Sequence, residues 1–439
     1  MPERNSPRPR VFVGWWSVLF IGIISGLGHG FNTYGISVFF KPIAAELELN
    51  RALTALAAGI GRLEGGITSP LVGWLSDKFG SRWITIIGIS IAGAGMVFMY
   101  FISQVWQYYV AWGVLIGLGL NIGLTVAVDK MINDWFIHRR GLAQGIKFAL
   151  IGIFGVVVLQ IITPMVLVQG WRFTSLLWGI IMFASLPLSY ALVKPRRPEY
   201  YGLLPDGAPV ARGAEMDRAR MIERGVSYAS SFQETEYTFR QVRKTRVYWL
   251  LVIGFCVHYF IGGGFNTHVF PFLTDIGISE AVAGGMMGIM VFFTVPSRFF
   301  GGVIADRVRK DRIHLLLVVA FLLQVIGIST FLLSRSTASV YVLLAGHGLS
   351  NGAITPLILL ILGRYFGRKA FGSVLGAMVA FGSPVGMLSP VFYGWIYDTT
   401  GSYFSAFVAA LGLSVLAIVT TLLVRPPGPP AEDVARPTW

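Results

Sequence analysis

Long apolar stretches, separated by short polar ones, make up most of the chain. Twelve of them reach about 20 residues or more, enough for a helix to cross about 30 Å of hydrocarbon. They lie at residues 13–40, 52–76, 83–102, 107–136, 141–168, 171–193, 247–273, 281–305, 313–333, 339–362, 370–395 and 403–424. The hydrophobic pattern therefore predicts an all-α protein with twelve transmembrane helices.

The second half of the chain repeats features of the first. The segment from Gly73 to Arg82 has a partial copy that ends at Arg307, and the aspartates of the two copies, Asp77 and Asp306, are 229 residues apart. A Phe-Asn-Thr triplet in the first span also recurs in the seventh. Repeated halves with a binding site between them are typical of membrane transporters. We therefore expect two pseudo-symmetric six-helix bundles.

Polar segments divide the chain into five expected parts. These are a cytoplasmic basic tail (1–12), an N-terminal bundle (13–193), a cytoplasmic linker (194–246), a C-terminal bundle (247–424) and a cytoplasmic Pro-rich tail (425–439). The linker carries eleven Lys or Arg and seven Asp or Glu. Its later part is expected to form an amphipathic helix on the inner surface, where basic patches bind anionic lipid. Both tails are expected to be disordered.

Composition and charge support a membrane protein. Hydrophobic residues make up 54% of the chain and charged residues 13%, and the mean hydropathy is +0.68, which excludes an ordinary soluble domain. A formal charge of +14 would suit nucleic-acid binding, but the basic residues lie on alternate loops. The expected outer loops carry only Lys41, Arg51, Arg172 and Arg335. Because cationic loops resist translocation, both termini are predicted to be cytoplasmic in the plasma (inner) membrane, with no nucleic-acid partner.

No clustered nucleophile, metal set or acid/base pair is visible in the sequence. The single cysteine, Cys256, lies inside a span, the six histidines are scattered, and HExxH does not occur. We therefore expect no catalytic residue, metal or cofactor. One cysteine also excludes a disulfide within the chain.

Charged residues inside the spans are the first candidates for function, since each costs at least about 2.5 kcal/mol at mid-membrane. Arg62 and Glu64 lie near the middle of the second span and point about 200° apart, so they form no same-face pair. Arg62 is a candidate for substrate binding and Glu64 for proton coupling, and the alternative is that both join neighbouring helices.

In the eighth span, Arg298 has a planar guanidinium group whose two N–H donors match the two oxygens of a carboxylate. We expect Arg298 to face the cavity and bind an anionic substrate, with a buried structural pair as the alternative.

The fourth and fifth spans contain a possible ion pair. Asp129 and Lys147 are equally far from the loop between the spans, so antiparallel helices place them at similar depth. A structural bridge is expected, although Asp129 is also a candidate for proton coupling because a low-dielectric site raises the affinity of a carboxylate for protons. Lys130 and Asp134 are expected nearer the headgroups, where long side chains reach water.

Polar side chains in the first and seventh spans complete the expected substrate site. They are His29, Asn32 and Tyr34 in the first span, and Asn266 and His268 in the seventh. The alternative for His29 is a packed ring bonded to a carbonyl group. His29 and His268 could also take up a proton.

The segment from Gly73 to Arg82 resembles the signature of the major facilitator superfamily, and the likeness extends over nearly all of residues 13–424. Trp83 replaces a basic residue, and Arg309 stands where the second copy should have glycine. The resemblance implies that the signature controls conformational change. A physical reason exists, because a carboxylate at one helix end can bind the positive N-terminus of a neighbouring helix and stabilise one state. The expected gating residues are Gly73, Asp77, Lys78, Arg82, Asp306 and Arg307.

Within the superfamily, the chain is similar to monocarboxylate porters and their bacterial relatives, including oxalate/formate exchangers. The likeness lies in residues 14–16, 36–41 and 134–141, and in Arg298 followed by Gly302.

Three departures from these relatives concern charged residues. Tyr34 stands where animal porters place a lysine, and Thr294 where they place an aspartate. The lysine that oxalate exchangers carry in the eleventh span has no counterpart. The proton-coupling machinery of these relatives is therefore not carried over.

The preferred hypothesis is a monomeric secondary transporter that moves a small organic anion, a monocarboxylate, by alternating access with proton coupling. An anion exchanger, with a counter-anion in place of protons, is one alternative. Efflux of apolar compounds is another, favoured by the many aromatic residues and disfavoured by the charges in the spans. A membrane sensor on the same fold is the last, although the linker is too short for a folded signalling domain.

Overall fold

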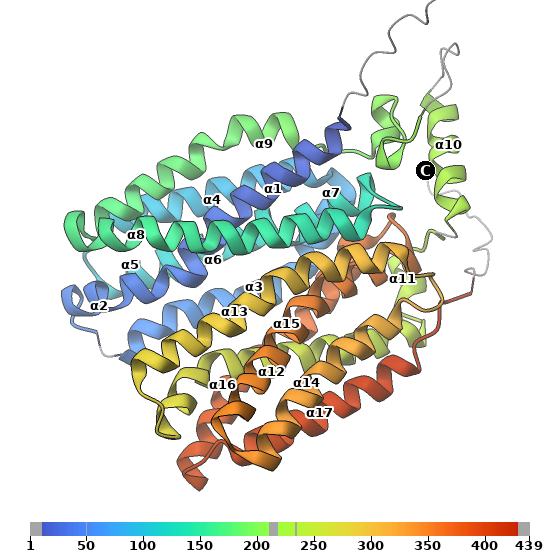
Figure 1. The fold of residues 1–439 in the computed structure, drawn as a ribbon. Coiled ribbons are helices and arrows are strands. Elements are labelled where there is room, and N and C mark those ends of the chain that lie inside the picture. The colour runs from blue at the N-terminus through green and yellow to red at the C-terminus, as the bar shows by residue number, and fades with distance from the viewer. Residues whose placement is uncertain (1–10, 50, 210–217, 233–234, 429–439) are drawn as a thin grey trace, which may run out of the picture.

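The computed structural model describes residues 11–428 apart from residue 50 and residues 210–217 and 233–234. The described residues form helices joined by short loops, with no strand among them. The long helices lie side by side in two groups, the first half of the chain in blue to green and the second in yellow-green to red (Figure 1). Most of the basic tail and the end of the Pro-rich tail, both expected to be disordered, lie outside the described residues.

The first span is longer than predicted. Helix α1 (Val13–His29) continues through a π-helical turn, η1 (Gly30–Tyr34), into α2 (Ile36–Glu46). Lys41, which was expected on an outer loop, lies within α2. The reason is that Phe39 and Ile43, four residues apart and fully buried, continue the apolar face of the helix.

The rest of the first bundle contains one helix with a sharp break. Its members are α3 (Arg51–Phe79), α4 (Ser81–Phe101), α5 (Val105–Tyr108), η2 (Tyr109–Ile116), α6 (Gly117–Asn121), η3 (Ile122–Val126), α7 (Ala127–Trp135), α8 (Arg140–Ala184) and α9 (Leu186–Leu192). Within α8, Gly170 has φ 85°, a left-handed conformation that glycine adopts without strain. The break separates the predicted fifth and sixth spans.

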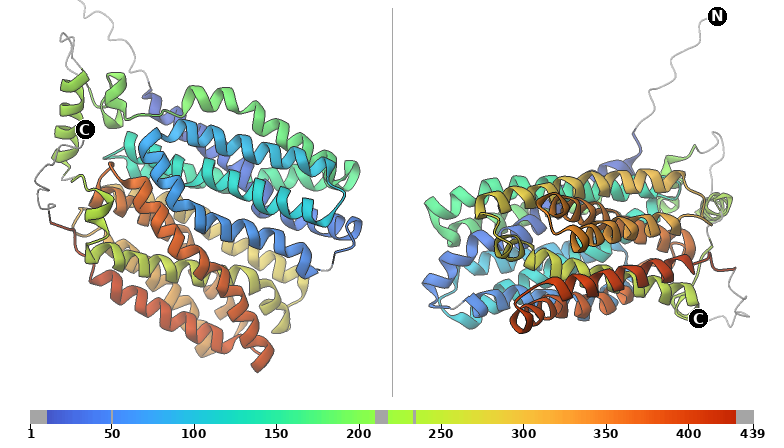
Figure 2. Two further views of the ribbon diagram at one scale, coloured as in Figure 1. Left: turned by 180° about the vertical axis from the view of Figure 1, so that it is seen from behind. Right: turned by 60° about the horizontal axis from the view of Figure 1, so that its bottom comes forward.

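The second bundle and the linker follow the same order as the sequence predicts. The bundle consists of α12 (Arg246–Asp275), α13 (Glu280–Arg307), α14 (His314–Ser334), α15 (Thr337–Phe366), α16 (Phe371–Thr400) and α17 (Phe404–Leu422). The linker contains η4 (Pro198–Tyr201), η5 (Pro205–Gly207), α10 (Arg218–Ser231) and α11 (Phe239–Val242). Two further views show α10 at one end of the bundles (Figure 2), and we call this the linker end.

The predicted twelve transmembrane helices are present. Among the described residues, ten helical segments are long and apolar enough to cross a membrane. One of them, Arg140–Leu192, contains both arms of the broken α8, and the charged helix α3 is not among the ten. The two arms and α3 bring the number of spans to twelve.

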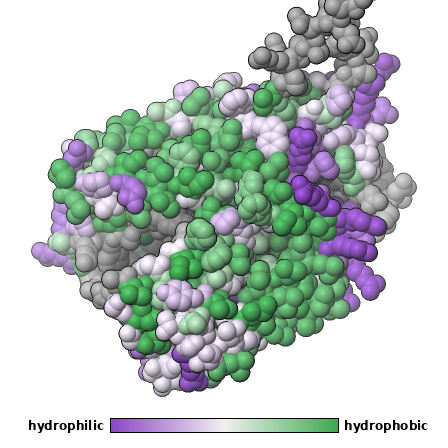
Figure 3. Space-filling model, in the orientation of Figure 1, coloured by the Kyte–Doolittle hydropathy of each residue, from purple (hydrophilic) through white to green (hydrophobic). Residues whose placement is uncertain are grey.

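The surface matches a lipid environment. Apolar side chains remain exposed along the sides of the bundles, such as Leu333 at 88% and Ile67 at 72%. Hydrophilic residues gather at the linker end, while hydrophobic ones cover much of the visible side (Figure 3). Apolar exposure on this scale is expected where lipid replaces water.

The two bundles meet along two helix pairs, α3 with α16 and α8 with α13. Glycines make these contacts close. A Cβ atom at Gly73 would collide with the main chain of Gly372, and one at Gly141 with that of Gly302. Small residues let membrane helices approach where water provides no hydrophobic drive. Gly73 and Gly302, equivalent positions of the repeat, thus each contact the opposite bundle.

Candidate functional site

The predicted ion pair between Asp129 of α7 and Lys147 of α8 is present in the first bundle. Their side chains are 5% and 2% exposed. Lys147 Nζ also lies 3.9 Å from the centre of the Phe148 ring. Two buried charges are stable when each compensates the other, so Asp129 is committed to Lys147.

Arg298 of α13 lies at the contact between the bundles. Its carbonyl group and the following residue pack against Gly145 of α8, on the opposite bundle. Arg298 is also within electrostatic reach of Lys147 and of His258 on α12. Cationic groups from both bundles therefore lie near one another inside the membrane.

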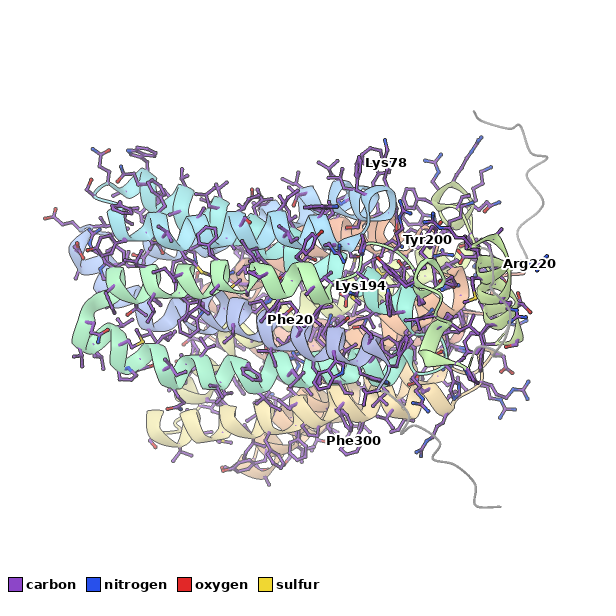
Figure 4. The ribbon with its side chains drawn as sticks, turned by 90° about the horizontal axis from the view of Figure 1, so that it is seen from above. Phe20, Lys78, Lys194, Tyr200, Arg220 and Phe300 are labelled. Atoms are coloured by element: carbon purple, nitrogen blue, oxygen red, sulfur yellow. The ribbon has the colours of Figure 1, made fainter. Side chains whose placement is uncertain are left out.

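The direction of the Arg298 side chain follows from its neighbour Phe300. Phe300 is 55% exposed and lies on the outer margin of the molecule, seen from above in Figure 4. Residues two apart on an α-helix point about 200° from each other. Because Phe300 faces outward and Arg298 is only partly exposed, Arg298 points toward the interior.

The other predicted binding residues differ in their surroundings. His29 places Nδ1 3.0 Å from the carbonyl oxygen of Ser25, the packed arrangement considered as its alternative. Asn32 is partly exposed within the π-helical turn. The side chains of Tyr34 and Arg62 lie outside the part of the chain that the structure describes. Of these four predicted binding residues, the structure therefore describes the side chains of His29 and Asn32.

The seventh-span candidates both contact other helices of the second bundle. His268 uses both ring nitrogens, at 3.0 Å from the Tyr403 hydroxyl and 2.9 Å from the Pro390 carbonyl oxygen. Asn266 is exposed and lies 3.3 Å from Nε2 of His347. His268 thus links α12 to α16 and to Tyr403, the residue before α17, and its hydrogen-bonding capacity is already used.

Glu64, the second carboxylate considered for proton coupling, is half-buried in α3. Its Oε2 atom is buried and has no hydrogen-bond partner among the described residues. No described hydrogen bond or ion pair to this oxygen therefore competes with a proton. Glu64 therefore remains a coupling candidate in the first bundle.

The two signature aspartates bind helix N-termini of the opposite bundle. Asp77, at the end of α3, accepts hydrogen bonds from the amides of Gly372 and Ser373 at 3.1 and 2.8 Å, where α16 begins. Asp306, at the end of α13, accepts them from the amides of Gly141 and Leu142, both at 2.7 Å, where α8 begins. Each carboxylate also meets the positive end of a helix dipole. The geometry anticipated for the signature is present twice.

The predicted basic members of the signature do not cross between the bundles in the same way. Lys78 lies over the Trp74 ring at 4.9 Å, at the linker end (Figure 4). Arg82 donates to the carbonyl oxygen of Val193 at 2.8 Å, within the first bundle. Arg307 is exposed at the end of α13. The aspartates, rather than these cations, make the described contacts between the bundles.

The structure corrects the expected position of Lys130 and Asp134. Both are buried between the bundles instead of reaching water near the headgroups. Lys130 Nζ lies 3.4 Å from Asp77, 3.0 Å from Asp134 and 3.1 Å from the carbonyl oxygen of Arg368. The opposite bundle covers this end of α7. The hydrophobic pattern of a single helix does not show which other helices pack against it.

A family model for the Major Facilitator Superfamily matches residues 19–388. The chain belongs to the major facilitator superfamily. Curated relatives extend the match over almost the whole length. The chain is 27% identical to monocarboxylate transporter 4 of Mus musculus over 94% of this chain and 83% of that protein. It is 24% identical to monocarboxylate transporter 2 of Homo sapiens, over 96% and 88%.

Solved structures show the same superfamily fold. The proton:xylose symporter XylE bound to 6-bromo-6-deoxy-D-glucose has a TM-score of 0.67 and 17% identity, covering 93% of this chain and 95% of that one. The human organic anion transporter MFSD10 (TETRAN) has a TM-score of 0.65 and 14% identity, covering 95% and 100%. The superfamily is one of transporters and not of enzymes, as expected for this chain.

The linker of this superfamily member joins corresponding loops of the two halves. Glu199 binds Arg368, between α15 and α16, at 2.9 Å, and both side chains are almost completely buried. Asp206 accepts hydrogen bonds of 2.8 to 3.1 Å from three successive amides, residues 137–139, between α7 and α8. These two loops occupy equivalent positions in the repeat.

A second set of contacts extends this linker junction. Glu236 accepts from the Lys369 amide at 2.6 Å and pairs with Arg197 at 3.0 Å. Tyr228 of α10 donates to Asp206 at 3.2 Å, and burial together with the Asp206 charge raises the pKa of Tyr228. These acidic residues carry the contacts of the linker, and the sequence pattern does not distinguish them from the other acidic residues of this predominantly basic segment.

Neutralising Glu199 is expected to weaken the linker junction. Glu199→Gln removes the charge that compensates the buried guanidinium of Arg368, and losing one partner of a buried pair costs about 3 kcal/mol. The melting temperature of the purified protein should fall. The matched control is Glu223→Gln, an exposed glutamate of α10, which should leave it unchanged. Equal melting temperatures for both variants would contradict the role of Glu199.

Proposed function

We propose that the protein is a secondary transporter that carries a small monocarboxylate together with a proton by alternating access, with Arg298 binding the carboxylate. The observation that carries this proposal is the position of Arg298 between the bundles, within electrostatic reach of Lys147 and His258. A group that contacts both bundles can hold the substrate while they rock about it.

The chemistry of the site suits an anion. Asp129 compensates Lys147, and the guanidinium of Arg298 brings a further positive charge within electrostatic reach of this pair. Guanidinium and carboxylate form paired, charge-assisted hydrogen bonds, which are about twice as strong as neutral ones. The relatives named above, monocarboxylate transporters, support the same substrate class.

Proton coupling follows from the energetics of moving an anion. Carrying one negative charge against a potential that is negative inside costs about 2.3 kcal/mol per 100 mV. A proton that moves in the same direction cancels this charge. Glu64 is the carboxylate candidate for this proton, because Asp129 is held by Lys147.

The proposed membrane is the plasma (inner) membrane, with the linker end cytoplasmic. The hydrogen bonds of Asp77 and Asp306 between the bundles lie at the linker end. In this orientation the structure is closed toward the cytoplasm.

Uptake into proteoliposomes tests the proposal. With the outside one pH unit more acidic, a labelled short monocarboxylate such as lactate or acetate should accumulate, up to about tenfold because one pH unit corresponds to 1.36 kcal/mol. Uptake should vanish when a protonophore removes the gradient, and the uncharged amide of the same acid should not be transported. Uptake no faster than in protein-free liposomes would refute a transport function for these substrates.

Anion exchange is the second candidate, and Thr294 favours it. This residue lies four positions before Arg298 and donates its hydroxyl to the carbonyl of Met290 at 2.8 Å. Threonine has no titratable group, so this position offers the arginine no neighbouring proton carrier. An exchanger would show uptake stimulated by unlabelled anion inside the liposomes and unaffected by the pH gradient.

A further inference from the structure

The interior of the second bundle contains titratable histidines but no carboxylate. Its acidic residues lie at or beyond helix ends, at Asp275, Glu280, Asp306, Asp311 and Asp398. The histidines inside its spans are His258, His268 and His347. A proton that crosses with the substrate through this bundle therefore has an imidazole as its natural carrier.

The surroundings of His347 suit two protonation states. The ring is 1% exposed and stacks on Phe265 with centroids 4.0 Å apart. Nδ1 lies 3.0 Å from Oε1 of Gln324 on α14, and Nε2 lies 3.3 Å from Oδ1 of Asn266 on α12. An imidazolium donates to two amide oxygens, whereas neutral imidazole donates to one and accepts from an amide that has rotated by half a turn. Both states are satisfied, and no carboxylate fixes either of them.

Polar groups flank His347 on two sides. On one side, Asn266 is exposed. On the other, a cavity of about 10 Å³, room for about one water molecule, is lined by His347, His258 and Ser350, among others. His258 bonds to Thr355 at 3.2 Å and is within electrostatic reach of Arg298.

The other two histidines are less suited to hold the proton. His268 has both nitrogens bonded to the Tyr403 hydroxyl and the Pro390 carbonyl oxygen. His258 is hydrogen-bonded to the Thr355 hydroxyl and lies within electrostatic reach of Arg298, and like charges repel. For His347, the facing groups from α12, α14 and α15 are His258, Gln324 and the neutral Ser350 and Asn351.

We propose that His347 is the residue that carries the transported proton, taking it on the side of Asn266 and exchanging it with water. The only bond that forms and breaks is N–H at the imidazole, and the imidazolium balances the bound carboxylate. This inference rests on the proposed symport and assigns the proton to His347 instead of Glu64, because both ring nitrogens of His347 have polar partners and the Oε2 atom of Glu64 has none among the described residues.

Two assays separate the failure of this inference from the failure of symport. Gradient-driven uptake needs the proton, whereas exchange of labelled for unlabelled carboxylate at equal pH needs only binding and alternating access. His347→Gln should lose at least nine-tenths of gradient-driven uptake and retain exchange. His314→Gln, at the start of α14, is the matched control and should retain both. If the unmodified protein exchanges without responding to a gradient, symport itself is wrong.

Gln324→Glu provides a second variant with a distinct signature. A carboxylate opposite Nδ1 stabilises the imidazolium, so the pH of half-maximal uptake should move upward. The proposal is overturned if His347→Gln keeps gradient-driven uptake, or if it loses exchange as well while its melting temperature stays normal. If His347→Gln does not fold, an unchanged pH profile in Gln324→Glu overturns it.

Discussion

Replacing Arg298 with alanine is expected to reduce carboxylate uptake by about 10- to 150-fold, because hydrogen bonds to a charged group contribute about 1.5–3 kcal/mol. The loss should appear at low substrate concentration, since the arginine binds the substrate directly. Labelled monocarboxylate uptake into proteoliposomes, measured over a range of concentrations, provides the comparison.

Arg298→Lys separates charge from geometry. Lysine keeps the positive charge but offers a single ammonium instead of a planar fork, so uptake should recover only in part. The control is Arg312→Ala, which removes an exposed arginine at the linker end. If Arg298→Ala transports at the full rate, the carboxylate is bound elsewhere and the proposed site is wrong.

Removing both signature aspartates is expected to open the linker end. In the double variant Asp77→Asn and Asp306→Asn, a neutral carboxamide replaces each carboxylate. The negative charge that binds a helix N-terminus of the opposite bundle is then lost. Charge-assisted hydrogen bonds contribute about 1.5–3 kcal/mol each. The bonds of the two aspartates therefore stabilise the closed state relative to the open state by at least about 3 kcal/mol. That energy corresponds to a population shift of more than about 100-fold.

Spin labels can measure this opening. Positions Phe79 and Arg312 are exposed at the linker end, one on each bundle, and Cys256→Ser removes the native thiol. The double variant should add a population with a longer distance between the labels. Glu223→Gln should not, because that glutamate is an exposed residue of the linker. An unchanged distance distribution in the double variant would show that the aspartates do not hold this end closed.

The relation between Asp129 and Lys147 could be predicted, whereas the position of Lys130 could not. Depth in the membrane follows from counting residues along a helix, and two residues equally far from one loop must lie at one level. Rotation about the helix axis is set by packing against neighbours and has no such simple rule. Lys130, one residue after Asp129, therefore proved to face the other bundle.

Contacts between segments that are distant in the sequence could not be predicted from the sequence either. Asn266, Gln324 and His347 come from three helices and meet at one imidazole ring. Glu199 is one of seven acidic residues in a predominantly basic linker, and its pairing with Arg368 spans 169 residues. Composition of a segment does not show which of its residues find partners.

The sequence alone determined the twelve spans, the twofold repeat and the aspartates that the repeat shares, because hydrophobic length and recurring motifs are local properties of the chain. Only the tertiary structure decided which side chains face the other bundle, the linker or one another. Those choices depend on the rotation and crossing of helices that are hundreds of residues apart, where close packing between glycines and buried charge pairing select one arrangement.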